Sequence, residues 1–249
     1  MSQSKFESKF SGAGPSFQPL YQQVKERLTQ YIVEQRWRPG EVLPNEFLLA
    51  EELGVSQGTV RKALSGLTEQ GVLVRRQGVG TFVSEHTGHS ALYRFFPLVA
   101  DGQPPELPTS EVLSLEYLSA SGEVAEALDL RSGEGVICMR RRRFLGGECC
   151  LLETLYLPEQ YFPKFPSANK IPHTLYHFYQ TDYRLTVDKT LDRIKAVSCS
   201  QKDAELMGID PNQPLLHFTR VAESLNGEKI EFRISRCRSD HYHYLVDLT

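Results

Sequence analysis

Hydrophobic residues along positions 44–83 recur first at the spacing of helices and then at that of strands. Four of them predict a first helix with one buried face: Phe47, Leu48, Ala50 and Leu53. Gly54 stands where that helix ends, and Ser56 carries an oxygen that can cap the next helix. A second buried stripe follows at Val60, Ala63, Leu64 and Leu67. The pattern predicts two short helices joined by a tight turn.

The segments on either side complete a small domain. After Gly71, two short runs at 73–76 and 78–83 flank a glycine-containing tip, which predicts a β-hairpin. Upstream, a helix is expected to open at Pro19, with its buried side formed by Leu20, Val24, Leu28 and Ile32. Three helices followed by a hairpin predict a winged helix-turn-helix, an architecture used for DNA recognition.

The exposed face of the second predicted helix, which starts after Ser56, carries side chains suited to DNA. Gln57 and Arg61 are four residues apart, so they lie one above the other near the positive end of the helix. Glutamine can pair with adenine and arginine with guanine, and Gly58 lets the helix come close. The candidate DNA-binding residues are Ser56, Gln57, Gly58, Thr59, Arg61, Lys62, Arg76, Gln77, Gly78 and Gly80. The alternative is a small α/β cap with a solvated basic edge.

Composition divides the chain into four parts. Residues 1–16 are rich in small and charged residues and are expected to form a mobile tail. Residues 17–84 form the predicted winged helix-turn-helix, and residues 85–91 have the small polar composition of a linker. The remaining residues, 92–249, are predicted to form a second domain.

The second domain is predicted to be α+β, built around an antiparallel sheet. Short β-like runs alternate with a few helical ones. Strands are expected at 112–118, 136–144, 148–157, 185–197, 215–222 and 230–238, and helices at 123–130 and 201–207. Glycines bracket the first of these helices.

Length and charge limit the possible functions. The chain has 249 residues, enough for two cores, and its formal net charge of −3 does not suit a general polyanion binder. Residues 18–86 carry as many acidic as basic side chains. DNA binding must therefore rest on local clustering and on pairing two copies. The cluster comprises Arg61, Lys62, Arg75 and Arg76.

Several classes of protein are not expected. No apolar run approaches the length of a membrane span and the N-terminus lacks a secretion signal, which predicts a cytoplasmic protein without a membrane partner. The five cysteines lack CxxC spacing, so neither disulfides nor a zinc knuckle are expected. His173 and His177 have helical metal-ligand spacing but no partner cluster, so we predict no metal and no cofactor.

The segment PNEFLLAEELGVSQGTVRKALSGLTEQGVLVRRQGVGTFV resembles the DNA-binding domain of the GntR family of bacterial transcription regulators. The resemblance covers residues 18–84. Two positions depart from it, because the family commonly has arginine where this chain has Phe47 and Gln57. Arg61 is retained. The departures imply an operator that differs from the family's commonest one.

The second half resembles the UTRA effector domain of the HutC subfamily, whose fold is that of chorismate lyase. The resemblance covers residues 92–249 and is carried by ICMRRRRFLGGECCLLETLYLP, PHTLYHFY and QPLLHFTRVAESLNGEKIEFRISRCRSDHYHYLVDL. It implies a homodimer on a palindromic double-stranded DNA operator. It also implies a small anionic effector, a carboxylate or a phosphate, that modulates operator binding.

The run Arg140–Arg143 is a candidate anion site. A strand sends alternate side chains to opposite faces, so one pair must point to the interior or a cleft unless the whole run is a solvated surface row. The resemblance places Arg141 and Arg143 on the pocket side. It adds four further candidates for effector binding: Glu153, Thr174, Tyr176 and Glu231. Cys237 stands where relatives may carry tyrosine, which removes a hydroxyl donor.

Two functional hypotheses follow. The first is a ligand-responsive transcription regulator, most often a repressor. The second is a chorismate-lyase-type enzyme that carries a DNA-binding module. No arrangement of nucleophile and base and no paired catalytic carboxylates are evident, so we predict no catalytic residues and favour the regulator.

Overall fold

The computed structural model describes residues 18–87 and 95–246. The predicted tail at 1–16 and most of the predicted linker lie outside the described residues. Two compact units divide between Glu85 and His86.

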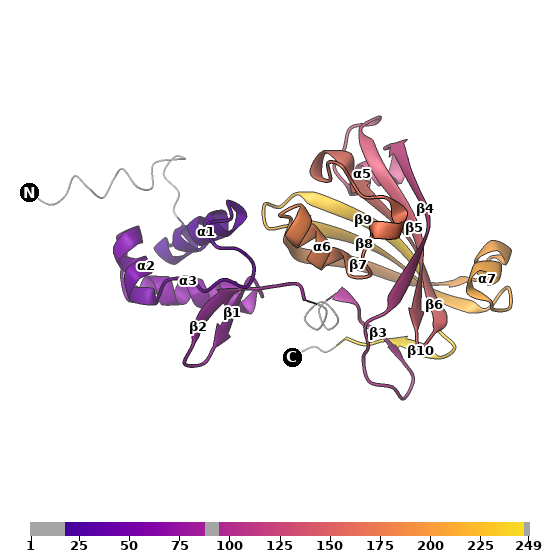
Figure 1. The fold of residues 1–249 in the computed structure, drawn as a ribbon, viewed down its shortest axis with the longest axis horizontal. Helices are drawn as coiled ribbons and strands as arrows, with labels where there is room; N and C mark the ends of the chain where they lie inside the picture. Colours follow the sequence, from indigo (N-terminus) through magenta and orange to yellow (C-terminus); the bar gives the residue numbers. More distant parts are fainter. Residues whose placement is uncertain (1–17, 88–94, 247–249) are drawn as a thin grey trace, which may run out of the picture. The chain divides into compact units, whose positions relative to one another are not determined.

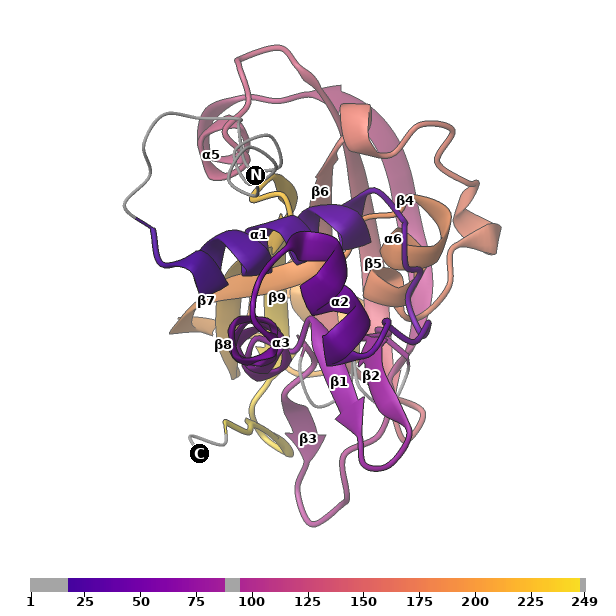
Figure 2. The same ribbon diagram turned by 90° about the vertical axis from the view of Figure 1, so that its left-hand side faces the viewer.

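The first unit contains three helices and a two-stranded antiparallel sheet (Figure 1). Its elements are α1 (Leu20–Val33), α2 (Glu46–Leu53), α3 (Gln57–Glu69), β1 (Leu73–Arg76) and β2 (Gly80–Val83). Both α1 and α2 pack against α3, and Figure 2 shows the β1–β2 hairpin beside them. This is the predicted winged helix-turn-helix.

Local signals fix the boundaries of α2 and α3. The side chain of Asn45 accepts a hydrogen bond from the backbone N–H of Leu48 at 2.9 Å and caps α2. Gly54 ends that helix with a φ of 67°, a conformation that glycine adopts without strain. Ser56 then caps α3 by accepting from the backbone N–H of Thr59 at 3.2 Å. The turn between the two helices therefore forms where predicted.

The predicted buried face of α2 is partly wrong. Leu49, Ala50 and Leu53 face the core, whereas Phe47 is 60% exposed and Leu48 is 49% exposed. Four apolar residues, 47–50, follow one another at this point, and helical periodicity allows more than one of them to face inward. In α3, the four residues predicted to be buried are buried.

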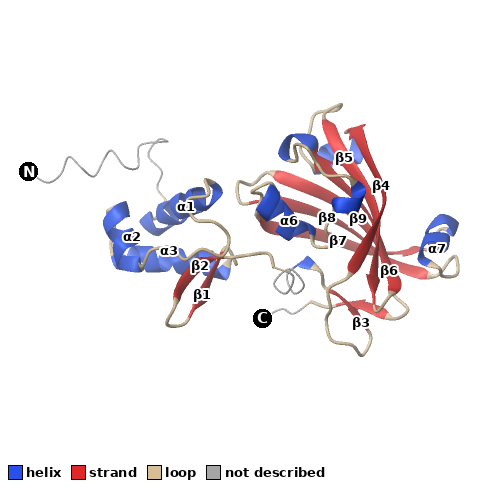
Figure 3. Ribbon diagram, in the orientation of Figure 1, coloured by secondary structure: helices blue, strands red, loops and turns tan. Residues whose placement is uncertain are grey.

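The second unit is built around a six-stranded antiparallel sheet, drawn in red in Figure 3. The strand order is β4-β5-β6-β9-β8-β7. The strands span Thr109–Ser119 (β4), Gly135–Leu145 (β5), Glu148–Pro158 (β6), Val187–Ser198 (β7), Pro214–Ser224 (β8) and Lys229–Arg238 (β9). All six lie where strands were predicted. The two central strands of the sheet, β6 and β9, pair with each other although they are far apart in sequence.

Helices cover the sheet on different sides. Helix α6 (Leu175–Asp182) lies over one face, where its tyrosines contact Glu231 of β9. Helix α5 (Gly122–Ala127) packs against Phe232, the next residue on β9, which points to the other face. A third helix, α7 (Gln201–Met207), contacts β6. The face under α6 holds the polar cluster described below.

Smaller elements complete the second unit. β3 (Leu98–Ala100) pairs with β10 (Tyr242–Tyr244), and short 3-10 turns span Glu159–Tyr161 and Ala168–Lys170. The helix predicted at 123–130 ends earlier, at Ala127, because Asp129 adopts a positive φ of 53°. Among the described residues, no helix has both the length and the apolar character needed to cross a bilayer.

Candidate nucleic-acid interface and anion pocket

The predicted recognition face of α3 is open to solvent. Gln57, Gly58, Arg61 and Lys62 are exposed, while the opposite side of the helix is buried. Ser56 and Thr59 have a structural use, because they form the N-terminal cap and their hydroxyls are 2.9 Å apart. The side chains of this helix that remain available to contact DNA bases are therefore those of Gln57 and of the exposed residues after Thr59.

Arg61 is held by a carboxylate from the neighbouring helix. Its Nε donates to Glu46 Oε2 at 2.8 Å, and Arg75 Nη2 lies 3.5 Å from the other oxygen of Glu46. The hydrogen bond with Glu46 raises the pKa of Arg61. The Arg61 side chain is 61% exposed, so water and salt weaken this ion pair. The guanidinium can therefore exchange Glu46 for a phosphate or a base at low cost.

Two further cations rest on aromatic rings. Lys62 Nζ lies 4.0 Å from the ring centre of Tyr21, and the Arg76 guanidinium lies 4.4 Å from that of Phe82. These contacts orient the cations and leave them exposed. Gln77 is exposed at the tip of the hairpin next to Gly78, whose φ is 72°.

Gly58 and Gly80 have different physical roles. A Cβ added at Gly58 would meet only Ser56 Oγ, at 3.8 Å, so packing within the chain does not require glycine there. A glycine inside a helix costs about 1 kcal/mol relative to alanine. Gly80, by contrast, has a φ of 149°, and a Cβ added there would lie 3.0 Å from Val42 Cγ2, so the hairpin itself requires glycine. Gly58 therefore leaves the exposed face of α3 without a side chain at this position, although the fold does not require it.

The run of four arginines on β5 divides between two faces. Arg141 and Arg143 point toward α6 and are 1% and 5% exposed. Arg140 is exposed, and Arg142 pairs with Glu111 at 2.5 Å on the other side. The alternative in which the arginines form a solvated surface row therefore holds only for Arg140 and Arg142.

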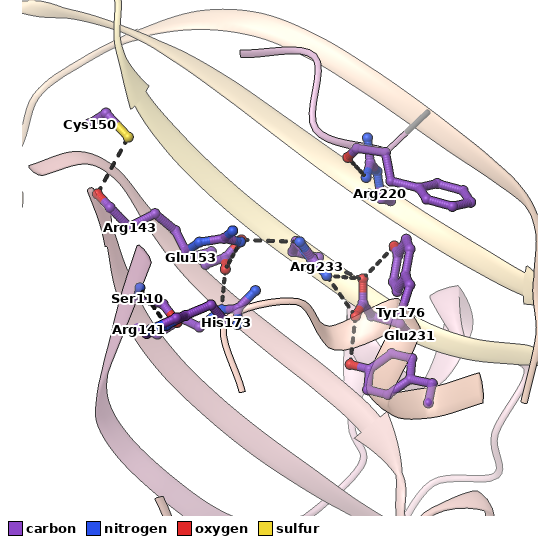
Figure 4. A network of polar contacts seen from close by, with 12 residues as sticks. Ser110, Arg141, Arg143, Cys150, Glu153, His173, Tyr176, Arg220, Glu231 and Arg233 are labelled. Atoms are coloured by element: carbon purple, nitrogen blue, oxygen red, sulfur yellow. Dashed lines mark hydrogen bonds and ion pairs between the residues drawn. The ribbon is translucent and has the colours of Figure 1, made fainter. Parts of the chain in front are cut away.

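Glu153 lies at the centre of the buried cluster (Figure 4). It faces Arg141 directly across β5 and β6 and accepts a hydrogen bond from Arg141 Nε. Arg143 Nη1 and Arg233 Nη1 each donate to it at 3.2 Å. Burial alone would raise the pKa of Glu153, but the charges of Arg141, Arg233 and Arg143 hold that pKa well below its usual value. Glu153 is therefore ionised, and both of its oxygens accept from arginines.

Glu231 is engaged in the same way. Its two oxygens accept from Tyr176 at 2.9 Å and Tyr179 at 2.8 Å, and Arg233 donates to them through Nε at 2.9 Å and Nη2 at 2.8 Å. Burial, followed by the charge of Glu231, raises the pKa of both tyrosines, so their hydroxyls remain donors. The carboxylate of Glu231 has no oxygen left over for a ligand.

The cluster carries an unbalanced positive charge. Three arginines (141, 143 and 233) face two carboxylates (153 and 231), all of them buried. Arg141 Nη1 and Arg143 Nε are buried without a hydrogen-bond partner in the described structure. Burial, together with the charge of Arg141, lowers the pKa of Arg143 to about 10. Buried donors without partners are costly, and an anion would satisfy them.

These two arginines open onto a small cavity of about 40 Å³. Its lining is Phe95, Phe96, Leu107, Pro108, Arg141, Arg143, His173, Thr174, Leu175, Tyr176 and Arg233. Thr174 is the N-cap residue of α6, and its hydroxyl makes no capping bond. His173 Nδ1 accepts from the backbone N–H of Ser110 at 2.9 Å. Among the described residues, no group of three or more metal-ligating side chains is present.

The structure thus separates the predicted effector residues into two groups. Arg141, Arg143, Thr174 and Tyr176 line the cavity, whereas Glu153 and Glu231 lie behind the arginines. Arginines and tyrosines already donate to both carboxylates, and the part these two residues play in effector binding stays a prediction.

Sequence reasoning missed Arg233 and Tyr179. Arg233 follows Glu231 by two residues on a strand, so a shared face could have been predicted for this pair. Cys237 packs in an apolar cluster with Leu151 and Tyr242 and does not line the cavity. Burial raises the pKa of its thiol, as expected for a small core residue.

Comparisons with known proteins agree with this geometry. Residues 20–83 match the model of the gntR family of bacterial regulatory proteins, and residues 106–243 match the UTRA domain. The histidine utilization repressor of Pseudomonas putida is 31% identical over 84% of this chain and 83% of its own length. The mannosyl-D-glycerate transport/metabolism system repressor MngR of Escherichia coli is 26% identical over 92% of this chain and 95% of its own length.

Solved structures agree as well. A chain described as the ligand-binding domain of a GntR-family regulator from Bordetella bronchiseptica covers 63% of this chain and 99% of its own length. It does so at 30% identity and a TM-score of 0.59. PhnF from Mycobacterium smegmatis, at 24% identity, covers 91% of this chain and 99% of its own length with a TM-score of 0.55, which supports the fold.

The fold and the two sites define a DNA-binding regulator with a small-molecule domain. The chain belongs to the GntR family, and it carries a UTRA domain after its winged helix-turn-helix.

Proposed function

We propose that this chain is a homodimeric transcriptional repressor in the cytoplasm. It binds a palindromic operator through α3 and the β1–β2 hairpin, and a small anion bound at Arg141 and Arg143 changes its affinity for that operator. The relatives reported above are named repressors, which supports the first part. The residual positive charge of the buried cluster supports the second.

The observation that carries the proposal is the pair of unsatisfied guanidinium nitrogens, Arg141 Nη1 and Arg143 Nε, at the cavity. A protein that needed these arginines only for stability would pair all of their donors. An anion placed here gains charge-assisted hydrogen bonds and offsets the excess charge. The site is therefore suited to bind a ligand.

The charge of the DNA-binding unit supports a dimer. Its exposed cations are few, and residues 18–86 carry as many acidic as basic side chains. Phosphate contacts supply much of the affinity for DNA, so one copy offers too few of them for a stable complex. Two copies related by twofold symmetry would read two half-sites about one helical turn apart.

The pocket is better suited to binding than to catalysis. A general base needs a free lone pair within reach of its substrate. Both oxygens of each cluster carboxylate instead accept from arginine or tyrosine donors. A pyruvate-release assay with chorismate tests the enzymatic alternative directly, and we expect no turnover.

The test is a gel-shift assay with the DNA upstream of the protein's own gene, repeated with candidate anions. We expect a retarded band whose intensity changes with one or more anions. Arg143→Ala should bind the DNA normally and lose the response, whereas Arg140→Ala, on the outward face of the same strand, should retain it. The absence of a retarded band at low salt, or an Arg143→Ala variant that responds at wild-type concentrations, would overturn the proposal.

A further inference from the structure

The contacts of the buried cluster also restrict what kind of anion can bind. This inference rests on the proposed effector role of the cavity. Three properties of the cluster matter: its net charge, its lack of free carboxylate oxygens and the apolar walls around it.

The excess charge matches one negative charge. Three buried arginines against two buried carboxylates leave a single positive charge, and Arg220 on β8 does not add to it because Asp192 pairs with it at 2.6 Å. His173 Nδ1 accepts from the backbone N–H of Ser110, so this ring nitrogen offers no proton to an anion. A carboxylate carries one negative charge, whereas a phosphate monoester carries between one and two at neutral pH.

Within the described residues, the cavity offers no free carboxylate to a cationic amine. Glu153 and Glu231 are the acidic residues of the cluster, and arginine or tyrosine donors occupy both. An ammonium group in the cavity would instead lie close to Arg141 and Arg143. Like charges in a buried site repel strongly, so amino acids and amino sugars fit poorly.

Apart from His173 and Thr174, the remaining walls are apolar or aromatic. The Arg143 guanidinium lies 5.0 Å from the ring centre of Phe96, and the rings of Phe95 and Tyr176 meet edge to face at 4.7 Å. Leu107, Pro108 and Leu175 complete the lining. A volume of about 40 Å³ favours a compact ligand.

We propose that the effector is a compact monocarboxylate with an apolar or aromatic body and no cationic group. Its carboxylate takes up the free donors of Arg141 and Arg143, and its body lies against Phe95, Phe96 and Leu107. Arg233, which itself lines the cavity, sets this preference because its donors occupy oxygens of both Glu231 and Glu153 that could otherwise receive an amine.

The test uses calorimetric titration of the full-length protein with matched probes. Acetate, crotonate and benzoate serve as monocarboxylates, phenyl phosphate adds charge to the aromatic body, and 4-(aminomethyl)benzoate adds an amine. We expect at least one monocarboxylate to bind about tenfold more tightly than phenyl phosphate and than 4-(aminomethyl)benzoate. Tighter binding of either of the latter, or no binding by any monocarboxylate, overturns the proposal.

Two variants sharpen this test. Arg143→Ala should abolish carboxylate binding, with Arg140→Ala as its control, and circular dichroism confirms that each is folded. Arg233→Met removes both arginine bonds to Glu231, whose oxygens then accept only from Tyr176 and Tyr179. It also removes the excess charge, so the preference should shift about tenfold toward 4-(aminomethyl)benzoate. An unchanged preference in folded Arg233→Met also overturns the proposal. Gel shifts on the same samples report on the proposed function separately, because operator binding without any probe does not depend on ligand class.

A second, independent observation concerns the start of the effector unit. His86, the first residue after the division between the units, is buried and its backbone N–H donates to Gln180 of α6 at 2.9 Å. Its ring Nε2 lies 3.1 Å from the carbonyl oxygen of Val187. The same ring meets Phe95 edge to face at 5.1 Å, and Phe95 meets Tyr176 at the cavity.

We infer that His86 is a positioning residue that transmits effector binding to the DNA-binding unit. A ligand that displaces Phe95 or Tyr176 changes the packing of His86, only three residues after β2 ends at Val83. His86→Ala should therefore bind benzoate, or the best monocarboxylate probe, and the operator with wild-type affinities but lose at least tenfold of the coupling between them. Thr87→Ala, next to it and exposed, serves as control. Wild-type coupling in folded His86→Ala, or loss of either binding step, contradicts the inference.

Discussion

Arginine forms ion pairs with glutamate in both units, in opposite environments. In the DNA-binding unit, Arg61 meets Glu46 with 61% of the arginine side chain exposed. In the effector unit, Arg141 meets Glu153 with 1% of either side chain exposed. Exposed pairs exchange partners readily because water and salt screen them, whereas a buried pair is locked by the cost of leaving a charge unpaired. The exposed environment of Arg61 suits a group that must bind a polyanion reversibly. The buried environment of Arg141 suits a rigid site that binds one small ligand selectively.

The largest effect should come from breaking the buried pair. Glu153→Gln keeps the shape of the side chain but leaves three buried arginines without their central anion. We expect it to cost about 3–5 kcal/mol of stability in the effector unit. Glu46→Gln, the matched change in the exposed pair, should have little effect on stability.

The two units can be followed separately in urea unfolding. The single tryptophan, Trp37, is buried in the first unit and reports on it by fluorescence, while far-UV circular dichroism also reports on the six-stranded sheet. Glu153→Gln should shift the circular dichroism transition and leave the Trp37 transition unchanged. Equal stability of wild type and Glu153→Gln would show that Glu153 is not central to the cluster.

The next effect tests the exposed arginine. Arg61→Ala should weaken operator binding roughly ten- to a hundredfold and relax base preference at one position, because a bidentate contact to guanine is lost. Stability should change little. Arg36→Ala is a matched control, since Arg36 also forms an exposed pair, with Glu52 at 2.5 Å, but lies outside α3. Fluorescence anisotropy with labelled operator measures both, and equal affinities of the two variants would contradict the recognition role.

The parts predicted from sequence are those specified locally. Helix α7 spans the predicted residues, because Ser200 caps it by accepting from the backbone N–H of Asp203 at 3.1 Å and Gly208 ends it with a φ of 69°. The tight turn before α3 was predicted from the same kind of signal. The assignment of Phe47 and Leu48 to the core failed, because periodicity alone could not choose among adjacent apolar residues.

The site was predictable only in part, because its partners come from distant strands. Alternation on β5 left two choices for the arginine pairs, and family resemblance selected Arg141 and Arg143, which are the buried pair. The engagement of Glu153 by Arg233 requires β6 and β9 to be neighbours, across 80 residues of sequence. No local pattern specifies that pairing.

A smaller effect concerns pH. The pKa of Glu153 is held below its usual value in the folded protein, so its stabilising contribution is present above its unfolded pKa of about 4.3 and is lost as pH falls toward the folded pKa. The stability difference between wild type and Glu153→Gln should therefore shrink below about pH 4.3. One titrating group changes the slope of the free energy of unfolding against pH by at most about 1.4 kcal/mol per pH unit. Urea unfolding at pH 7, 4 and 3 measures this, and a difference that stays constant would contradict the ionised pair.

The smallest expected change in stability comes from Gly58→Ala, and it has the opposite sign. Alanine in place of glycine within a helix stabilises it by up to about 1 kcal/mol, and the new Cβ would meet only Ser56 Oγ at 3.8 Å. Operator affinity should nevertheless fall, because the methyl group occupies the space that α3 needs to approach the DNA.

Gly66→Ala provides the matched control on the same helix. Position 66 faces the flexible side chain of Lys25, whose Nζ lies 3.7 Å from the position of an added Cβ, so alanine is accommodated there. Both variants should raise the midpoint of the Trp37 unfolding transition, and only Gly58→Ala should lose affinity in the anisotropy assay. A methyl group at the centre of a surface that lies against the bases should weaken operator binding. If both variants bound the operator like the wild type, the exposed face of α3 would therefore not be that surface.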